Sequence, residues 1–276
     1  MSITASQVNA LRKKTGAGMM DCKKALVEAN GDEQAAIDIL RKKGQKVAAK
    51  RGDNETKEGL VIAKTYNSDK EGVILSLSCE TDFVAKNEDF YKLVDSLVDC
   101  AQSSGSTDVD SFMNAKYDDA MTVAEKVTEQ IGVIGEKLEI SNLGIINADA
   151  VVAYNHPGNQ IASLVGLTKE GESAIDAGKQ VAMQVAAMAP IALDKDGIDQ
   201  ETIDRELEVG KELAIQEGKP AEMAENIAKG RLNKFFKENT LLSQAFIKDN
   251  KKSVEQFLKE TEDGLTVIDF KRVALK

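Results

Sequence analysis

The sequence predicts an α+β protein with two small antiparallel sheets covered by helices. An apolar run at 60–67 is followed by residues 73–79, whose side chains alternate at the spacing of a strand. A second pair of such runs follows at 151–158 and 161–167. Elsewhere, apolar residues recur at helical spacing. With 276 residues, 42% of them hydrophobic, the chain is long enough for two or three domains.

Residues 1–54 predict a compact bundle of three short helices, each closed by a glycine that relieves the left-handed end of a helix. The first helix runs from Thr4 to Lys14 and ends at Gly16, and the others end at Gly31 and Gly44. Residues 46–58 are charged and predict a linker. Apolar residues at helical spacing define the three helices and are expected to face inward. They are Val8 and Leu11 in the first helix, Met19, Cys22, Leu26 and Ala29 in the second, and Ala36, Ile37 and Leu40 in the third.

The loop at residues 15–20 is rich in glycine and opens a helix, so a phosphate-binding role needs consideration. It lacks the G-x-x-x-x-G-K-[ST] pattern, and no strand precedes it. A tight turn between two helices is the better account. The alternative for Met19 is exposure at this turn as a contact for a partner helix.

The stretch 78–87 organises the first half of the core. It is a turn from the strand 73–79 into a helix predicted over 87–103, with Asn87 as its cap. Its tip carries Phe83 beside Asp82. The ring either folds back under its own sheet or projects as a wedge that inserts into a partner. A further helix is predicted over 118–130.

The second half repeats this plan: a hairpin at 151–167 and a helix over 172–189. We interpret this as a weak internal duplication of an α+β unit. The stretch matching the tip is 169–171, Lys-Glu-Gly, which has no aromatic residue. The lack of an aromatic residue in the second copy counts in favour of a projecting Phe83 ring, and burial of the ring under its own sheet stays open. His156, the one histidine, is either ordinary turn chemistry or a surface contact.

Residues 191–231 predict a helical hairpin broken at 218–220, with Pro220 at the first helical position. Its apolar stripe is narrow and its flanks are charged, which favours a projecting antiparallel coiled coil over a hairpin packed on the body. The stripe is Ile203, Leu207, Gly210 and Ala214, then Met223 and Ile227. The chain then returns to the core through Phe235, Phe236, Leu241, Leu242, Phe246 and Ile247, a capped helix at 253–260 and a closing strand at 265–270.

The net charge of −10 is unevenly distributed, because residues 1–54 carry about +5 and the remainder about −15. An acidic body argues against wrapping nucleic acid, and 4% aromatic residues leave few stacking platforms. Three cysteines without C-x-x-C spacing argue against disulfides or a zinc site. With no apolar run long enough for a bilayer and no signal pattern, we expect a cytoplasmic protein without membrane association.

Two long stretches resemble the signatures of the elongation factor Ts family. They are LRKKTGAGMMDCKKAL at residues 11–26 and CETDFVAKN at residues 79–87. The order of parts is similar along essentially the whole chain. The resemblance implies a ubiquitin-associated-like domain at 1–54, a first core half at 55–145, a second at 146–190 and 232–276, and a coiled-coil hairpin at 191–231.

The resemblance further implies a guanine-nucleotide exchange factor, not an enzyme, that binds elongation factor Tu in its GDP-bound and nucleotide-free forms. The stretch Thr81, Asp82, Phe83 and Val84 would reach into the partner's GTPase domain and displace its magnesium ion. Arg12, Met19, Met20 and Lys23 in the head, and His156 in the second half, are further expected contacts. No cofactor or metal of its own is expected. A homodimer or a 2:2 complex stays open.

Two departures from the family pattern stand out. Ser76 and Ser78 occupy positions where many members have Glu and Asn, with little expected effect. The chain also lacks a further C-terminal helix of some members, so affinity would rest more on the head and core. Two competing functions are RNA or ribosome binding by the basic head and a transferase using the 16–18 loop with Asp21 and Lys23.

Overall fold

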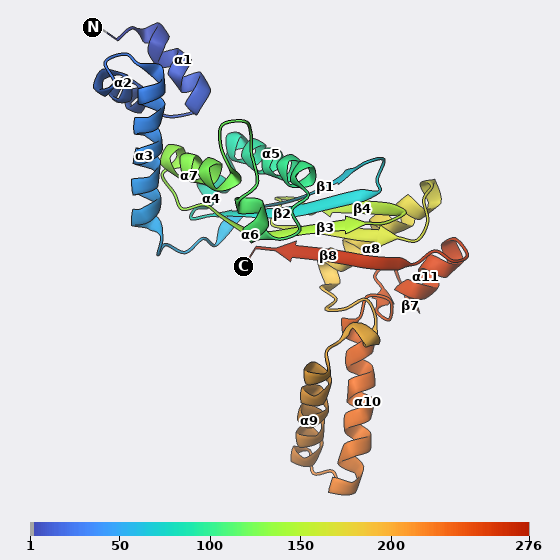
Figure 1. Ribbon diagram of the computed structural model, residues 1–276. Helices are drawn as coiled ribbons and strands as arrows, with labels where there is room; N and C mark the ends of the chain where they lie inside the picture. Colours follow the sequence, from blue (N-terminus) through green and yellow to red (C-terminus); the bar gives the residue numbers. More distant parts are fainter. Residues whose placement is uncertain (1–2, 276) are drawn as a thin grey trace.

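The computed structural model describes residues 3–275 and confirms the α+β class (Figure 1). The body contains two three-stranded antiparallel sheets, ordered β1-β2-β3 and β4-β5-β8, and a two-stranded pair, β6-β7. The strands are β1 (Glu58–Tyr66), β2 (Glu71–Cys79), β3 (Glu139–Asn147), β4 (Ala150–Asn155), β5 (Ile161–Leu167), β6 (Ala245–Phe246), β7 (Asp249–Ser253) and β8 (Val267–Ala274).

Both predicted hairpins and the closing strand are present, but strand β3 was not predicted. It pairs with β2 across a register shift between Ser76 and Leu77, which interrupts the alternation that would reveal a strand. Ser76 and Ser78 are buried in β2, and the hydroxyls of both lie within 3.1 Å of the Ser141 hydroxyl on β3. These serines therefore help to hold β3 to β2.

The head is formed by α1 (Ala5–Thr15), α2 (Met19–Glu28) and α3 (Glu33–Arg51). Val8, Leu11, Cys22 and Leu26 are buried in its core, as expected. Helix α1 ends where predicted, with Gly16 in the left-handed region at φ 67°. The turn after α2 likewise contains the expected glycine, Gly31.

The predicted end of the third helix at Gly44 is wrong. Helix α3 continues to Arg51, so only the later part of the predicted linker is without helix. Gly44 is buried against α7 (Val123–Ile134), where a Cβ atom would lie 2.9 Å from the backbone oxygen of Thr128. This glycine permits two helices to cross closely, and it does not terminate either of them.

The first sheet is covered on one face by α5 (Glu88–Ser104) and α7, with α6 (Val109–Met113) beside them. Helix α5 begins after its predicted cap, Asn87. Helix α7 begins at Val123 and not at 118, because Thr122 and Glu125 form a reciprocal capping box. Asp118 instead accepts hydrogen bonds from the backbone of residues 120 and 121 in the preceding turn.

The second sheet is covered by α8 (Glu172–Met188) and α11 (Val254–Thr261), which share its apolar core. The expected helix over 172–189 is confirmed, and Ser253 caps α11 as predicted. The uncovered faces of the two sheets pack on each other. This interface is Val61, Ala63, Ile74, Ile146, Val151, Ala162 and Leu164.

After a short 3₁₀ turn, η1 (Lys195–Gly197), helices α9 (Gln200–Gln216) and α10 (Ala221–Asn239) form a hairpin that projects from the sheets (Figure 1). The predicted stripe on the second helix is wrong by one residue: Met223 is 54% exposed, whereas Ala224 and Ala228 are buried. Gly210 lies so close to Ala228 that only small side chains fit between the helices. Pro220 is the cap preceding α10 and not its first residue.

On the return to the body, Leu241 and Phe246 are buried as expected, but Ile247 is 51% exposed. The division of the chain into four domains at the boundaries given above stays a prediction.

Candidate partner-binding site

Phe83 lies on a single-turn helix, α4 (Asp82–Ala85), between β2 and α5. Its side chain is 83% exposed, more than any other large apolar side chain in residues 3–275. The interpretation that this ring folds under its own sheet is therefore wrong. Val84 and Ala85 pack against the first core, so the opposite side of the turn faces outward and carries the ring.

Asp82 precedes Phe83 and lies in the same turn. Its Oδ2 accepts a hydrogen bond of 2.6 Å from Lys86 Nζ, and the side chain is 45% exposed. That hydrogen bond, with the charge of the lysine, holds the pKa of Asp82 below its ordinary value. The carboxylate beside the ring is thus ionised at neutral pH and paired with a cation of its own helix.

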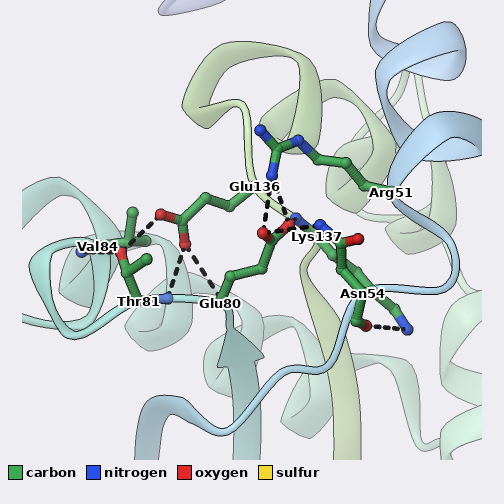
Figure 2. A network of polar contacts seen from close by, with 7 residues as sticks. All are labelled: Arg51, Asn54, Glu80, Thr81, Val84, Glu136 and Lys137. Atoms are coloured by element: carbon green, nitrogen blue, oxygen red, sulfur yellow. Dashed lines mark hydrogen bonds and ion pairs between the residues drawn. The ribbon is translucent and has the colours of Figure 1, made fainter.

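Thr81 caps α4 and is itself held by Glu136, which follows α7 (Figure 2). Glu136 Oε2 accepts from the backbone N–H groups of Glu80 and Thr81, at 3.1 and 3.0 Å. Glu136 Oε1 accepts from the Thr81 hydroxyl at 2.6 Å. One carboxylate therefore binds three donors at the base of the turn that carries Phe83.

Glu80 forms a second carboxylate contact beside the first. Its oxygens accept from Arg51 Nη1 at 2.9 and 2.7 Å, from Asn54 Nδ2 at 2.9 Å and from the Lys137 backbone at 2.6 Å. Burial of Glu80 acts to raise its pKa, but the hydrogen bonds and the Arg51 charge outweigh burial and lower it. Figure 2 shows this cluster joining the end of α3 to the base of α4.

The predicted head residues lie on α1 and α2. Met19 is 54% and Met20 62% exposed, and Arg12 and Lys23 are exposed as well. Met19 therefore lies at the surface and not in the helical core. The structure places Asp82 and Phe83 on one turn, whereas Arg12 lies on α1 and the other three head residues lie together on α2.

His156 is exposed at the turn after β4, and its Nδ1 lies 3.0 Å from the Tyr154 hydroxyl. The preceding residue, Asn155, binds the backbone N–H and oxygen of Ala63 in β1, at 2.8 and 2.9 Å. That pair of bonds fixes this turn to the first sheet. Its role was not predicted from the sequence, where Asn155 is an ordinary turn residue.

Glu136 was also missed, and no local signal points to it. It follows Gly135, which ends α7 in the left-handed region, and it contacts residues more than fifty positions earlier. Within residues 3–275, no group of three or more His, Cys, Asp or Glu side chains is placed to hold a metal ion. In the same part of the chain, no helix combines the length and apolar character needed to cross a membrane.

The fold and site define an α+β protein whose candidate site is an exposed turn that carries Phe83 and not a pocket. Residues 80–276 match the family model described as Elongation factor TS. The chain is 53% identical over 273 residues to elongation factor Ts of Christiangramia forsetii, covering 99% of this chain and 98% of that protein. It therefore belongs to the elongation factor Ts family, whose members act in protein biosynthesis.

Two further relatives carry the same name. The protein of Amoebophilus asiaticus is 49% identical over 99% of both chains. That of Porphyromonas gingivalis is 42% identical over 100% of this chain and 99% of its own. The similarity thus extends over the head as well as over the part that the family model matches.

Proposed function

We propose that this chain is a guanine-nucleotide exchange factor that binds elongation factor Tu in its GDP-bound form and inserts Phe83 into the GTPase domain. Insertion displaces the magnesium ion that helps to hold GDP, and GTP then binds the emptied site. Membership of the elongation factor Ts family supports exchange on elongation factor Tu during translation elongation. The observation that carries the insertion step is the 83% exposure of Phe83 on an anchored turn.

Exchange of this kind needs no chemical step and follows from linkage. A factor that binds the nucleotide-free partner more tightly than the GDP-bound partner weakens GDP binding by the same ratio. Reversing a 99:1 equilibrium requires about 5.5 kcal/mol of differential binding. Burying one Phe side chain contributes roughly 1.5–3 kcal/mol. The head, the second core half and the loss of magnesium coordination must therefore supply the rest.

The other predicted residues have distinct parts in this proposal. Asp82 brings negative charge near the nucleotide phosphates and the magnesium ligands, after exchanging its contact with Lys86. Thr81 and Val84 anchor the turn, since one caps α4 and the other packs on the core. The exposed head residues Met19 and Met20 would grip the GTPase domain.

The proposal extends to the arrangement of the molecule. Residues 1–54 form a ubiquitin-associated-like domain, the two sheet units are the halves of a duplicated core, and the α9–α10 hairpin is a coiled-coil arm. His156 in the second half contacts another domain of the partner. The complex forms in the cytosol, with this chain as a homodimer or in a 2:2 complex with its partner.

Stopped-flow release of labelled GDP from elongation factor Tu tests the insertion step. We expect Phe83→Ala to slow the maximal release rate far more than it weakens complex formation. Met223→Ala is the matched control, because it truncates another exposed apolar side chain on the distant hairpin. Release by Phe83→Ala at the rate of the unmodified chain would refute the insertion step.

A further inference from the structure

The end of α7 contacts three separate parts of the molecule within five residues. Val133 packs against the core of the head. Glu136 binds the base of the turn that carries Phe83, and the Lys137 backbone N–H donates to Glu80. Lys137 Nζ also donates to the backbone oxygens of Gly52 and Asn54, at 2.9 and 3.1 Å.

The turn that carries Phe83 depends on contacts of this kind for its orientation. Helix α4 has four residues, too few to be stable alone. The N–H groups at its start have no partner within the helix. Glu136 accepts from the two backbone N–H groups just before it and from the capping hydroxyl of Thr81. Without that carboxylate, the backbone N–H groups of Glu80 and Thr81 and the Thr81 hydroxyl would lose this acceptor, and the packing of Val84 and Ala85 would remain with the contacts of the Glu80 side chain.

The neighbouring contact extends this anchor to the head. Arg51 is the last residue of α3, and its Nη1 donates to both oxygens of Glu80, which directly precedes Thr81. The side chain of Glu80 is 15% exposed and that of Arg51 is 38% exposed, so the pair is partly shielded from solvent on the glutamate side. The end of α3 in the head and the turn that carries Phe83 are therefore both attached to the same cluster of contacts around Glu80.

We propose that Glu136 is a positioning residue for nucleotide exchange: it sets the direction in which Phe83 projects, relative to the head, by holding Glu80 and Thr81. Its effect on exchange rests on the proposed function of Phe83, whereas its effect on the ring's mobility does not. The two effects are therefore measured separately.

The first measurement uses the chain alone. It contains no tryptophan, so Phe83→Trp introduces a single tryptophan at the tip of the turn, which can be excited selectively in the presence of the four tyrosines. Time-resolved anisotropy of full-length Phe83→Trp is compared with the same chain carrying Glu136→Ala, Glu136→Gln or Glu125→Ala. Glu125 is the control, since it forms the capping box at the other end of α7 and makes no bond to α4.

We expect Glu136→Ala to increase the fast local depolarisation of Trp at position 83, and Glu125→Ala to leave it unchanged. Glu136→Gln should restore most of the order, because its amide oxygen accepts from both N–H groups and its NH₂ donates to the Thr81 hydroxyl. Unchanged local motion in folded Glu136→Ala overturns the proposal. If Glu136→Ala does not fold, Glu136→Leu replaces it, because leucine keeps much of the side-chain volume and has no acceptor for the three donors. Local motion equal to that of the parent chain then overturns the proposal as well.

The second measurement is GDP release at saturating factor. We expect Glu136→Ala to lower the maximal rate roughly tenfold or more, through misplacement of the ring, with less than about a twofold change in half-saturating concentration. Added to Phe83→Ala, it should cause no further loss, since it acts through the ring. Additive losses overturn the proposal. If Phe83→Ala alone has no effect, the proposed function fails, and the anisotropy still decides whether Glu136 orders the turn.

Discussion

Gly44 of α3 and Gly132 of α7 meet backbone to backbone: a Cβ atom added at Gly132 would lie 2.6 Å from the Gly44 Cα. Both glycines lie inside helices, where glycine normally costs about 1 kcal/mol relative to alanine. The close crossing that they permit attaches the head to the first core half. Because α7 also leads to Glu136, the crossing contributes to the junction beneath Phe83.

Replacement of Gly44 by alanine should destabilise the protein in spite of the better helix propensity of alanine. The new methyl group would lie 2.9 Å from the Thr128 backbone oxygen, and separating the helices should cost about 1–3 kcal/mol. Urea unfolding measures the difference. Gly230→Ala is the control, because Gly230 lies in α10 with nothing within 4 Å, and it should stabilise by roughly 0.4–1 kcal/mol. Equal effects of the two substitutions would contradict this account.

The same pair shows what the sequence could reveal of the fold. Glycine spacing located the ends of α1 and α2, because those glycines adopt positive φ. It failed at Gly44, because a glycine that permits close helix crossing has the same appearance in a sequence as one that ends a helix. Met223 was misplaced for a related reason, since the hairpin packs through alanines too small to dominate a hydrophobic pattern.

The candidate site was predictable in part. Comparison of the two hairpins favoured an exposed Phe83, and the structure places the ring outward. The support beneath the ring was not predictable, because the contacts of Glu136 and Arg51 with Glu80 and Thr81 depend on how α7 and α3 cross in the folded chain. Contacts between residues so far apart leave no periodic trace in one sequence.

GDP and this chain should weaken each other's binding to elongation factor Tu by the same factor, as linkage requires. We expect the affinity for the nucleotide-free partner to exceed that for the GDP-bound partner roughly 10⁴-fold, the ratio that corresponds to about 5.5 kcal/mol. Isothermal titration calorimetry with both forms of the partner measures the ratio. Excess GDP should release the partner in a pull-down, and excess GDP that leaves the complex intact would be inconsistent with linkage.

Glu80 should contribute stability that disappears in acid. Its folded pKa lies below the ordinary value of 4.5, so the unfolded chain binds the proton more readily. The contribution is therefore complete above pH 4.5 and is lost as the pH falls through the folded pKa. Glu80→Gln should cost about 1.5–3 kcal/mol at pH 7, as expected for hydrogen bonds to a charged group, and progressively less below pH 4.5.

Urea unfolding of both chains across this pH range tests the prediction. Glu88→Gln is the control, because Glu88 pairs with Lys92 at 2.9 Å but is 83% exposed. An exposed pair of this kind contributes little, so the control should change stability by less than about 0.5 kcal/mol. A loss for Glu80→Gln that stays constant down to pH 3 would show that the charge of Glu80 is not responsible.

Cys79, which ends β2 beneath the Phe83 turn, should resist thiol reagents in the folded protein. Burial, with the nearby charge of Glu136, raises its pKa to about 12. Since the thiolate is the reactive form, roughly one molecule in ten thousand is reactive at pH 8, against about a tenth for a thiol with the ordinary value of 9.0. Cys22 and Cys100 are buried too.

Alkylation at pH 8 followed by peptide mapping should therefore label Cys79 about a thousandfold more slowly in the native chain than in urea. Rapid native labelling of Cys79 would mean that the junction under Phe83 opens freely, and a ring on so loose a support could not act as a wedge.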